Sequence, residues 1–193
     1  LHESFTMITG SEPAQVEITV DEKGERGSVI SLKKIPLRSP RTMDICIIST
    51  IGDEFNLNNI IKLTGNIALD IQGYVRVAEL NHHKLFIPKK IVSRLLVVKA
   101  TKSELTHLTN KFITDQKNRI LVVTKGARGV DIFNCNKKYS FASGRVNTTD
   151  TIGAGDTFVT AFMVSYLHTH DIKKAGPFAI RYVGRRSGCR RAV

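Results

Sequence analysis

The sequence has little cysteine and no long apolar run. Its three cysteines, Cys46, Cys135 and Cys189, are odd in number and form no CxxC pair. This excludes a disulfide framework and a zinc knuckle, and it predicts three free thiols. No apolar stretch approaches the roughly 18 residues of a membrane-spanning helix, and the opening residues LHESFTMITGSEP lack the zones of a signal peptide. We therefore expect a cytoplasmic protein without a membrane partner.

The composition is that of an ordinary globular protein, with one unusual segment at the C-terminal end. Of 193 residues, 41% are hydrophobic and 24% charged, which suits one domain with a real core. The formal net charge is +12, and residues 171–193 hold seven Lys or Arg against one Asp. Since the last part, RRSGCRRAV, shows neither helical nor strand periodicity, residues 184–193 are predicted to be an irregular basic tail. Because a basic tail can hold nucleic acid through its phosphates, a non-catalytic nucleic-acid-binding protein is one alternative.

Short β-branched runs alternate with helical patterns through the middle of the chain. The runs MDICIIST, NIALDI, RLLVVKA and RILVVTKG show little polar alternation, which is typical of parallel strands covered on both faces. This order predicts an α/β fold. Helices are predicted over residues 56–63, 88–93 and 103–117 and after residue 156, and hairpins over residues 16–35 and 129–141.

A glycine-rich turn, DTIGAGD at residues 150–156, stands where an extended segment enters the last predicted helix. Glycines permit a positive φ and close approach of a ligand, and the unpaired N–H groups of a helix start can hold a phosphate. Asp156 would then lie beside the anion, where it could take a proton from an attacking hydroxyl. The alternative is an ordinary helix start with Thr151 or Asp150 as N-cap.

The segment DTIGAGDTF and the following AFMVSYL closely resemble the signature of the ribokinase-like (PfkB-type) carbohydrate kinases. The resemblance implies an ATP-dependent enzyme that moves the γ-phosphoryl group to a hydroxyl of a sugar, inositol or nucleoside, with Mg²⁺. It implies that Asp156 is the catalytic base and that Gly153, Ala154 and Gly155 form the anion hole. A nucleic-acid partner is then not expected.

The same resemblance implies a ribokinase-like three-layer α/β/α fold with a mostly parallel sheet and a small β lid. Residues 44–183 would be the nucleotide-binding core, and residues 1–43 a partial lid hairpin with its connection. Family members often pair through the lid, so a homodimer through residues 16–35 is expected.

A second segment, VTKGARG at residues 123–129, resembles the family's TxGxxG nucleotide-binding segment. The resemblance assigns Thr124, Gly126 and Gly129 to the nucleotide, together with Thr151 of the glycine-rich turn. The structural alternative is a strand that ends in a hairpin turn.

A third segment, Thr101–Glu104, stands where the family carries NxxE, with Thr101 replacing the Asn. The resemblance implies that Glu104 helps to place Mg²⁺. The same residues also form a capping box, in which Thr101 and Glu104 each satisfy a backbone N–H at a helix start.

A fourth segment, DIQGYVR at residues 70–76, follows a predicted buried strand, at the edge where open α/β sheets bind ligands. It resembles the family's DxNxR region, and its DxQGxxR form resembles most the inositol-kinase-like members. Asp70, Gln72 and Arg76 are thereby predicted to contact the substrate. The alternative is a strand-end polar cluster bonded to itself.

The resemblance covers residues 5–183, and family members normally carry a further segment ahead of it. We therefore expect a fragment that lacks the N-terminal part and is incomplete at both ends, with weak nucleotide binding and poor turnover by itself. An inactive kinase remnant is the other alternative.

Overall fold

A six-stranded sheet forms the centre of the computed structural model, which describes residues 15–21, 24–31, 34, 43–80, 82–143 and 153–189. The strands follow the order β3-β4-β5-β6-β7-β8. Strands β3 to β6 are parallel to one another, and β7 pairs antiparallel with both β6 and β8. The four predicted strand runs and the second hairpin are thus confirmed. The strands are β3 (Ile45–Ile48), β4 (Asn66–Asp70), β5 (Leu95–Thr101), β6 (Ile120–Thr124), β7 (Val130–Asn134) and β8 (Lys137–Phe141).

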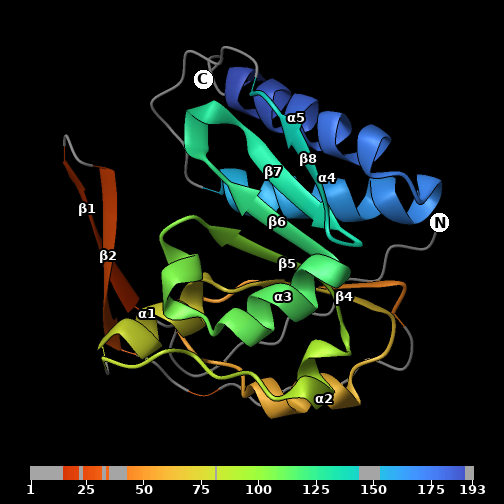
Figure 1. Ribbon diagram of the computed structural model, residues 1–193. Coiled ribbons are helices and arrows are strands. Elements are labelled where there is room, and N and C mark those ends of the chain that lie inside the picture. The colour runs from red at the N-terminus through yellow and green to blue at the C-terminus, as the bar shows by residue number, and fades with distance from the viewer. Residues whose placement is uncertain are drawn as a thin grey trace.

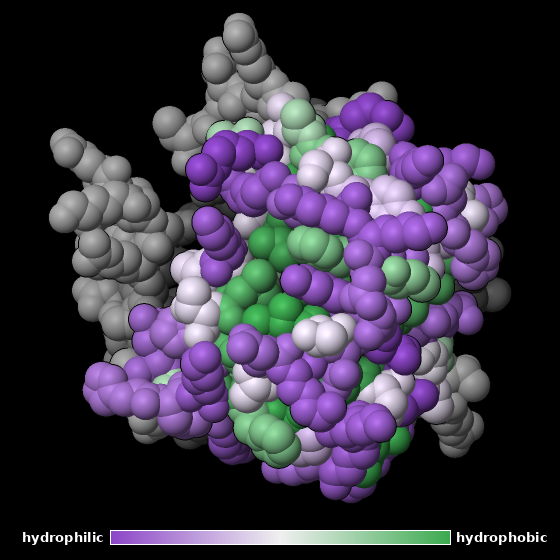
Figure 2. All heavy atoms as spheres, in the orientation of Figure 1, coloured by the Kyte–Doolittle hydropathy of each residue, from purple (hydrophilic) through white to green (hydrophobic). Residues whose placement is uncertain are grey.

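Helices cover both faces of this sheet, so the predicted α/β/α layering is confirmed (Figure 1). One face carries α1 (Gln72–Leu80), α2 (Lys89–Val92) and α3 (Asn110–Asn118), with the 3-10 helices η1 (Leu57–Lys62) and η2 (Glu104–His107). The other face carries α4 (Ala154–Thr169) and α5 (Ile172–Cys189). The side of the molecule seen in Figure 2 is mostly hydrophilic, with apolar side chains visible in its middle.

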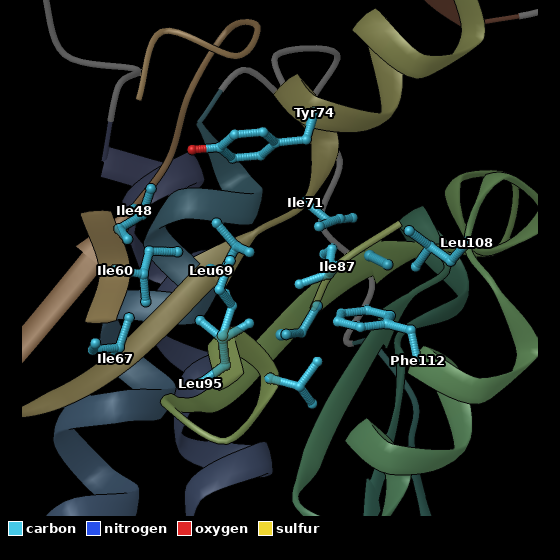
Figure 3. Close-up of a cluster of buried hydrophobic side chains, with 14 of the residues drawn as sticks. Ile48, Ile60, Ile67, Leu69, Ile71, Tyr74, Ile87, Leu95, Leu108 and Phe112 are labelled. Atoms are coloured by element: carbon cyan, nitrogen blue, oxygen red, sulfur yellow. The ribbon is translucent and has the colours of Figure 1, made fainter. Parts of the chain in front are cut away.

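Two hydrophobic cores, one on each face, explain why the strand runs lack polar alternation. In β6, Leu121 packs into the core under α1–α3, whereas Val122 packs into the core under α4 and α5. Figure 3 shows the first core, which includes Leu69 and Leu95 of neighbouring strands and Phe112 of α3. Burial of each such side chain contributes about 1.5–3 kcal/mol, so both faces must stay covered.

The carboxyl ends of the parallel strands meet at one edge of the sheet, and this edge carries the candidate site. Asp70 at the end of β4 is the register partner of Lys99 in β5, and Thr101 is the partner of Thr124 at the end of β6. The N-terminal end of α4 lies over the same edge (Figure 1). Ligands of open α/β sheets bind at this edge.

The prediction of one helix over residues 103–117 is wrong. The segment divides into η2 and α3, because Leu108 between them is extended (φ −98°, ψ 154°) and forms a parallel β-bridge with Leu85. Thr109 then starts α3 as its N-cap, since its side chain accepts a hydrogen bond from Phe112 N.

The prediction that residues 184–193 are irregular is wrong for 184–189, which continue helix α5 as far as Cys189. The helix is established upstream, where Ile172, Ala175 and Ala179 are buried at helical spacing against the sheet. Helices propagate more easily than they start, so the basic residues extend it without periodicity of their own. Residues 190–193 lie outside the described part.

The N-terminal hairpin consists of β1 (Gln15–Asp21) and β2 (Gly24–Ser31), which pair antiparallel, so the predicted hairpin is confirmed. Figure 1 shows it (red) beside the sheet. Lys34, just after the hairpin, donates to the carbonyl oxygen of Asp53 at 2.8 Å and forms an ion pair with its carboxylate. The homodimer through residues 16–35 stays a prediction.

Two further expectations concern the thiols and the membrane. Cys46 and Cys135 are free thiols, as predicted. Within the described part of the chain, no helix combines the length and apolar character that crossing a bilayer requires.

Candidate active site

The glycine-rich turn leads directly into α4. Gly153 is the N-cap, with φ 74° and ψ 4°, so the alternative with Thr151 or Asp150 as N-cap is wrong. A Cβ atom added to Gly153 would meet no described atom within 4 Å. Among the described residues, the space beside Gly153 is therefore open, and it lies at the positive end of the helix dipole, where an anion is favoured. Thr151 lies outside the described residues.

Asp156 projects an exposed carboxylate from the first turn of α4. Its Oδ1 atom accepts a hydrogen bond of 2.6 Å from the hydroxyl of Ser49, which follows β3. Sequence reasoning missed Ser49, although its place directly after a parallel strand was a usable signal. The contact shows that a hydroxyl group can approach the predicted base at hydrogen-bond distance.

A buried ion pair lies under this turn. Lys99 Nζ is 2.7 Å from Asp70 Oδ2, and the two side chains are 7% and 5% exposed. The second carboxylate oxygen of Asp70 accepts from Gln72 N at 3.1 Å. Asp70 thus has the contacts of the self-bonded alternative, and its contact with a substrate stays a prediction. Lys99, a residue that sequence reasoning missed, approaches the turn.

Glu104 and Thr101 form the capping box. Thr101 N donates to Glu104 Oε2 at 2.8 Å, and Glu104 N donates to Thr101 Oγ1 at 3.2 Å. Burial raises the pKa of the Glu104 carboxyl, and the nearby Asp70 adds to the rise, whereas the Thr101 bonds and Lys99 oppose it. The other oxygen, Oε1, has no hydrogen-bond partner among the described residues, so the cap leaves it available for a ligand.

The predicted nucleotide segment combines one open glycine and one packed glycine. Gly126 has φ 58°, and a Cβ atom there would meet no described atom within 4 Å. Gly129 has φ 95°, and a Cβ atom there would lie 2.1 Å from the carbonyl oxygen of Phe141. The structural alternative therefore accounts for Gly129, whereas Gly126 leaves room for a ligand beside Thr124, which ends β6.

Helix α1 supports the loop that carries Ser49. Arg76 Nη1 donates to the carbonyl oxygen of Ile51 at 3.2 Å. A Cβ atom on Gly73 would lie 2.4 Å from the carbonyl oxygen of Gly52, so helix and loop are in direct contact. Sequence reasoning also missed Glu54, whose buried carboxylate accepts from Ile51 N at 3.0 Å and Gly52 N at 2.7 Å. Contacts of Gln72 and Arg76 with a substrate stay a prediction.

The fold thus brings most predicted residues to one edge of the sheet. Asp70, Glu104 and Lys99 influence one another electrostatically, and the turn at Gly155 lies against Lys99. Thr124 ends the neighbouring strand. The arrangement offers a carboxylate base, a helix N-terminus for an anion and a carboxylate oxygen for a cation, which is the set that phosphoryl transfer requires.

Comparison with known proteins agrees with this chemistry. The family model for pfkB family carbohydrate kinase matches residues 66–182. A nucleoside kinase of Methanocaldococcus jannaschii is 28% identical over 138 residues, which are 69% of this chain and 45% of that protein. The chain thus matches less than half the length of this curated relative.

Solved structures share the fold. A sulfate complex of a pyrophosphate-dependent kinase in the ribokinase family has a TM-score of 0.73 and 20% identity, covering 92% of this chain and 70% of that one. A pyrophosphate-dependent kinase of the ribokinase family, complexed with a pyrophosphate analog and myo-inositol, has a TM-score of 0.64 and 22% identity, covering 84% and 65%. The predicted ribokinase-like fold is therefore confirmed.

Proposed function

Because this chain belongs to the pfkB family of carbohydrate kinases, we propose that it is the catalytic part of an ATP-dependent phosphotransferase. The acceptor is a hydroxyl of a sugar, an inositol or a nucleoside. One observation carries the proposal: the Asp156 carboxylate, already within 2.6 Å of a hydroxyl, lies in the first turn of a helix whose glycine N-cap adjoins open space.

Asp156 is the general base in this proposal. The acceptor hydroxyl takes the place that Ser49 Oγ holds against Oδ1. Its proton passes to the carboxylate as its oxygen attacks the γ-phosphorus of ATP, and the bond from that phosphorus to the bridging oxygen breaks to release ADP. An exposed carboxylate at a helix start suits this task, since it is reachable from solvent and rigidly held by the helix backbone.

The turn Gly153–Gly155 holds the transferred phosphoryl group in this proposal. The N–H groups of the first turn of α4, beside the open space at Gly153, stabilise negative charge on the phosphoryl oxygens in this proposal. Acceleration comes from positioning and from this charge stabilisation, because phosphoryl transfer asks little covalent chemistry of the protein.

The nucleotide lies along the ends of β5 and β6. Gly126 leaves space there, Thr124 contributes a hydroxyl, and Thr151 is assigned from the family resemblance. Gly129 serves the fold of this loop rather than the ligand, because its Cβ position is filled by the backbone of Phe141.

Mg²⁺ fits the donor set through Glu104. The described residues contain no cluster of three or more His, Cys, Asp or Glu side chains. Proteins commonly hold Mg²⁺ through one or two carboxylates, with water and substrate phosphates as the other ligands. Glu104 would hold it, directly or through water, with the Oε1 atom that the cap leaves unused. When bound, Mg²⁺ supplies charge neutralisation on the phosphate oxygens.

The acceptor pocket would be completed by Gln72 and Arg76 at the start of α1. The relatives named above suggest that nucleosides and myo-inositol should be the first acceptors tested, together with sugars. They also suggest pyrophosphate as a second donor to test against ATP.

The test is a coupled phosphorylation assay with both donors, Mg²⁺ and a panel of sugars, inositols and nucleosides, comparing the wild type with Asp156→Asn. The Asn keeps size and hydrogen bonding but removes the base, so turnover should fall by roughly 10²-fold or more while donor binding persists. Asp115→Asn on α3 is the matched control, since the one ion pair of Asp115 within the described part of the chain is a surface pair with Lys111. Unchanged turnover in Asp156→Asn would exclude the assignment, and folded protein without turnover would favour the inactive remnant.

A further inference from the structure

The buried pair of Lys99 and Asp70 has no counterpart in the mechanism above. Lys99 is 7% exposed and Asp70 is 5% exposed, so both charges are almost fully removed from water. Such burial costs several kcal/mol for each ion, and the attraction within the pair often fails to offset it. A buried ion pair is therefore weak support for a purely stabilising role, and its position must be considered.

The side-chain direction of both residues points to α4. In β5, Val97 packs into the core under α4 and α5, and Lys99, two residues later, lies on the same side of the sheet. In β4, Ala68 packs into the same core, and Asp70, two residues later, also lies on that side of the sheet. The pair is thus directed at the helix that carries the glycine-rich turn.

The pair presents its positive end to this turn. A Cβ atom on Gly155 would lie 3.1 Å from Lys99 Nζ and 4.0 Å from Asp70 Oδ2. A cation at a helix N-terminus is unfavourable unless an anion joins it, because the helix dipole is also positive there. Of the two paired charges, the ammonium is the nearer to Gly155, so the positive end of the pair and the start of α4 lie together where a bound anion would be held.

Three carboxylates, those of Asp70, Glu104 and Asp156, belong to this region. Glu104 interacts electrostatically with both Lys99 and Asp70, and Asp156 follows Gly155 in the chain. Against three carboxylates, Lys99 is the one basic side chain that the described residues place beside Gly155. A polyanionic donor entering among these carboxylates requires a fixed cation to offset their repulsion.

We propose that Lys99, held by Asp70, is a positioning residue of the phosphoryl site, and that its ammonium supplies the fixed positive charge behind the Gly153–Gly155 anion hole. It acts through the turn and not by contact with the acceptor. Asp70 then holds Lys99 in place instead of binding substrate. This inference rests on the proposed function.

The test is pyrophosphate binding by calorimetry, without acceptor and at low ionic strength. The variant is Lys99→Met/Asp70→Asn, which removes both charges and keeps an oxygen for the bond from Gln72 N. Its affinity should fall about tenfold or more, with a matching rise in the KM for the donor and an unchanged KM for the acceptor. The control, Lys111→Met/Asp115→Asn, makes the same two substitutions in a surface pair on α3 and should bind like the wild type.

Gly155→Ala provides a second variant that keeps every charge. Its methyl group would press on the Lys99 ammonium at 3.1 Å, while alanine suits a helix better than glycine, so the protein should fold. Weaker pyrophosphate binding is expected here too. If the double variant does not fold, pyrophosphate binding by Gly155→Ala tests the role of Lys99 instead.

The outcomes separate the two proposals. Wild-type pyrophosphate affinity in either folded variant would overturn the role of Lys99, whatever the activity. Loss of turnover in Asp156→Asn alone would then leave the kinase assignment standing. Normal turnover in Asp156→Asn, combined with lost pyrophosphate binding in the Lys99 variants, would retain the anion site and exclude Asp156 as base. A parallel loss of donor and acceptor affinity would indicate a merely structural pair and overturn the inference.

Discussion

At the scale of single residues, Asp131 on β7 illustrates how a partly exposed cluster makes stability depend on pH. Burial alone would raise the pKa of its carboxyl, but hydrogen bonds from Lys125, Lys138 and Ser140 lower it from 3.8 to about 2. Since the pKa is lower in the folded state, the ionised side chain stabilises the fold above about pH 4. This contribution is lost as the pH falls from about 4 toward 2.

We expect the Asp131 contribution to be roughly 2 kcal/mol or less, because Lys138 is half exposed and solvent screens the pair. Urea unfolding of the wild type and Asp131→Asn should differ by this amount at pH 7 and converge near pH 2. Asp115→Asn on α3 should show little difference at either pH. A constant difference across the range would mean that the charge of Asp131 does not stabilise the fold.

Glu104 has two roles to separate, the helix cap and the proposed Mg²⁺ contact. Glu104→Gln keeps an oxygen that can accept from Thr101 N but removes the charge. The free energy of unfolding should therefore change by less than about 1 kcal/mol. The Mg²⁺ concentration for half-maximal ADP binding should rise about tenfold. Thr101→Val removes the hydroxyl that accepts from Glu104 N, so the free energy of unfolding should fall by about 1 kcal/mol. The Mg²⁺ dependence of ADP binding should stay unchanged in this variant. If both variants show the same Mg²⁺ dependence, Glu104 serves only as a helix cap and does not contact Mg²⁺.

At the scale of elements, the loop between β6 and β7 contains two glycines with different tasks. Gly129→Ala would force a Cβ atom within 2.1 Å of the Phe141 carbonyl oxygen at φ 95°, and should cost roughly 3 kcal/mol or more. Gly126→Ala enters open space and should cost only about 1 kcal/mol for its positive φ. Thermal denaturation of both variants measures the contrast, and equal losses would contradict this division.

The strands and their layering could be predicted from the sequence, because β-branched runs such as RLLVVKA report burial on both faces directly. Helix α5 could not. After Ile172, the buried side chains that the structure describes in this helix are those of the small Ala175 and Ala179, which give a weak apolar signal, and Pro177 between them argues against a helix. Gly176 has a tertiary purpose, since a Cβ atom there would lie 2.6 Å from the Phe141 ring of β8. Helix α1 was missed because its first residues were interpreted as a polar strand exit.

Some residues of the candidate site could be predicted from the sequence, and others could not. Asp156 and its glycines follow from a contiguous motif, and they do lie at an open helix start. Lys99 and Ser49 carry no motif signal of their own. They reach the turn only through the register of β5 with β4 and through the loop after β3, and such long-range proximity cannot be read from spacing along the chain.

At the scale of the whole molecule, the sheet is not equally protected. Strands β4, β5 and β6 have neighbours on both sides and nearly inaccessible side chains, whereas β3 has a strand neighbour on one side only within the described part. Edge strands leave backbone groups unpaired. Hydrogen exchange should therefore be slowest in β4–β6 and markedly faster in β3.

Mass-spectrometric exchange at two protein concentrations would test this ordering. Fast exchange of β3 at both concentrations agrees with a free edge. If β3 exchanges as slowly as β5, the edge is covered, and a dependence of that protection on concentration would show that a second copy covers it.

The bond from Ser49 to Asp156 has a consequence for fidelity. A kinase that binds its donor before its acceptor risks spending the donor on water. With the serine hydroxyl on Oδ1, water must first displace a tethered competitor, whose effective concentration is high because the folded loop holds it there. The protein would thus favour acceptors that also gain contacts elsewhere in the pocket, and Ser49→Ala should raise donor hydrolysis relative to product formation.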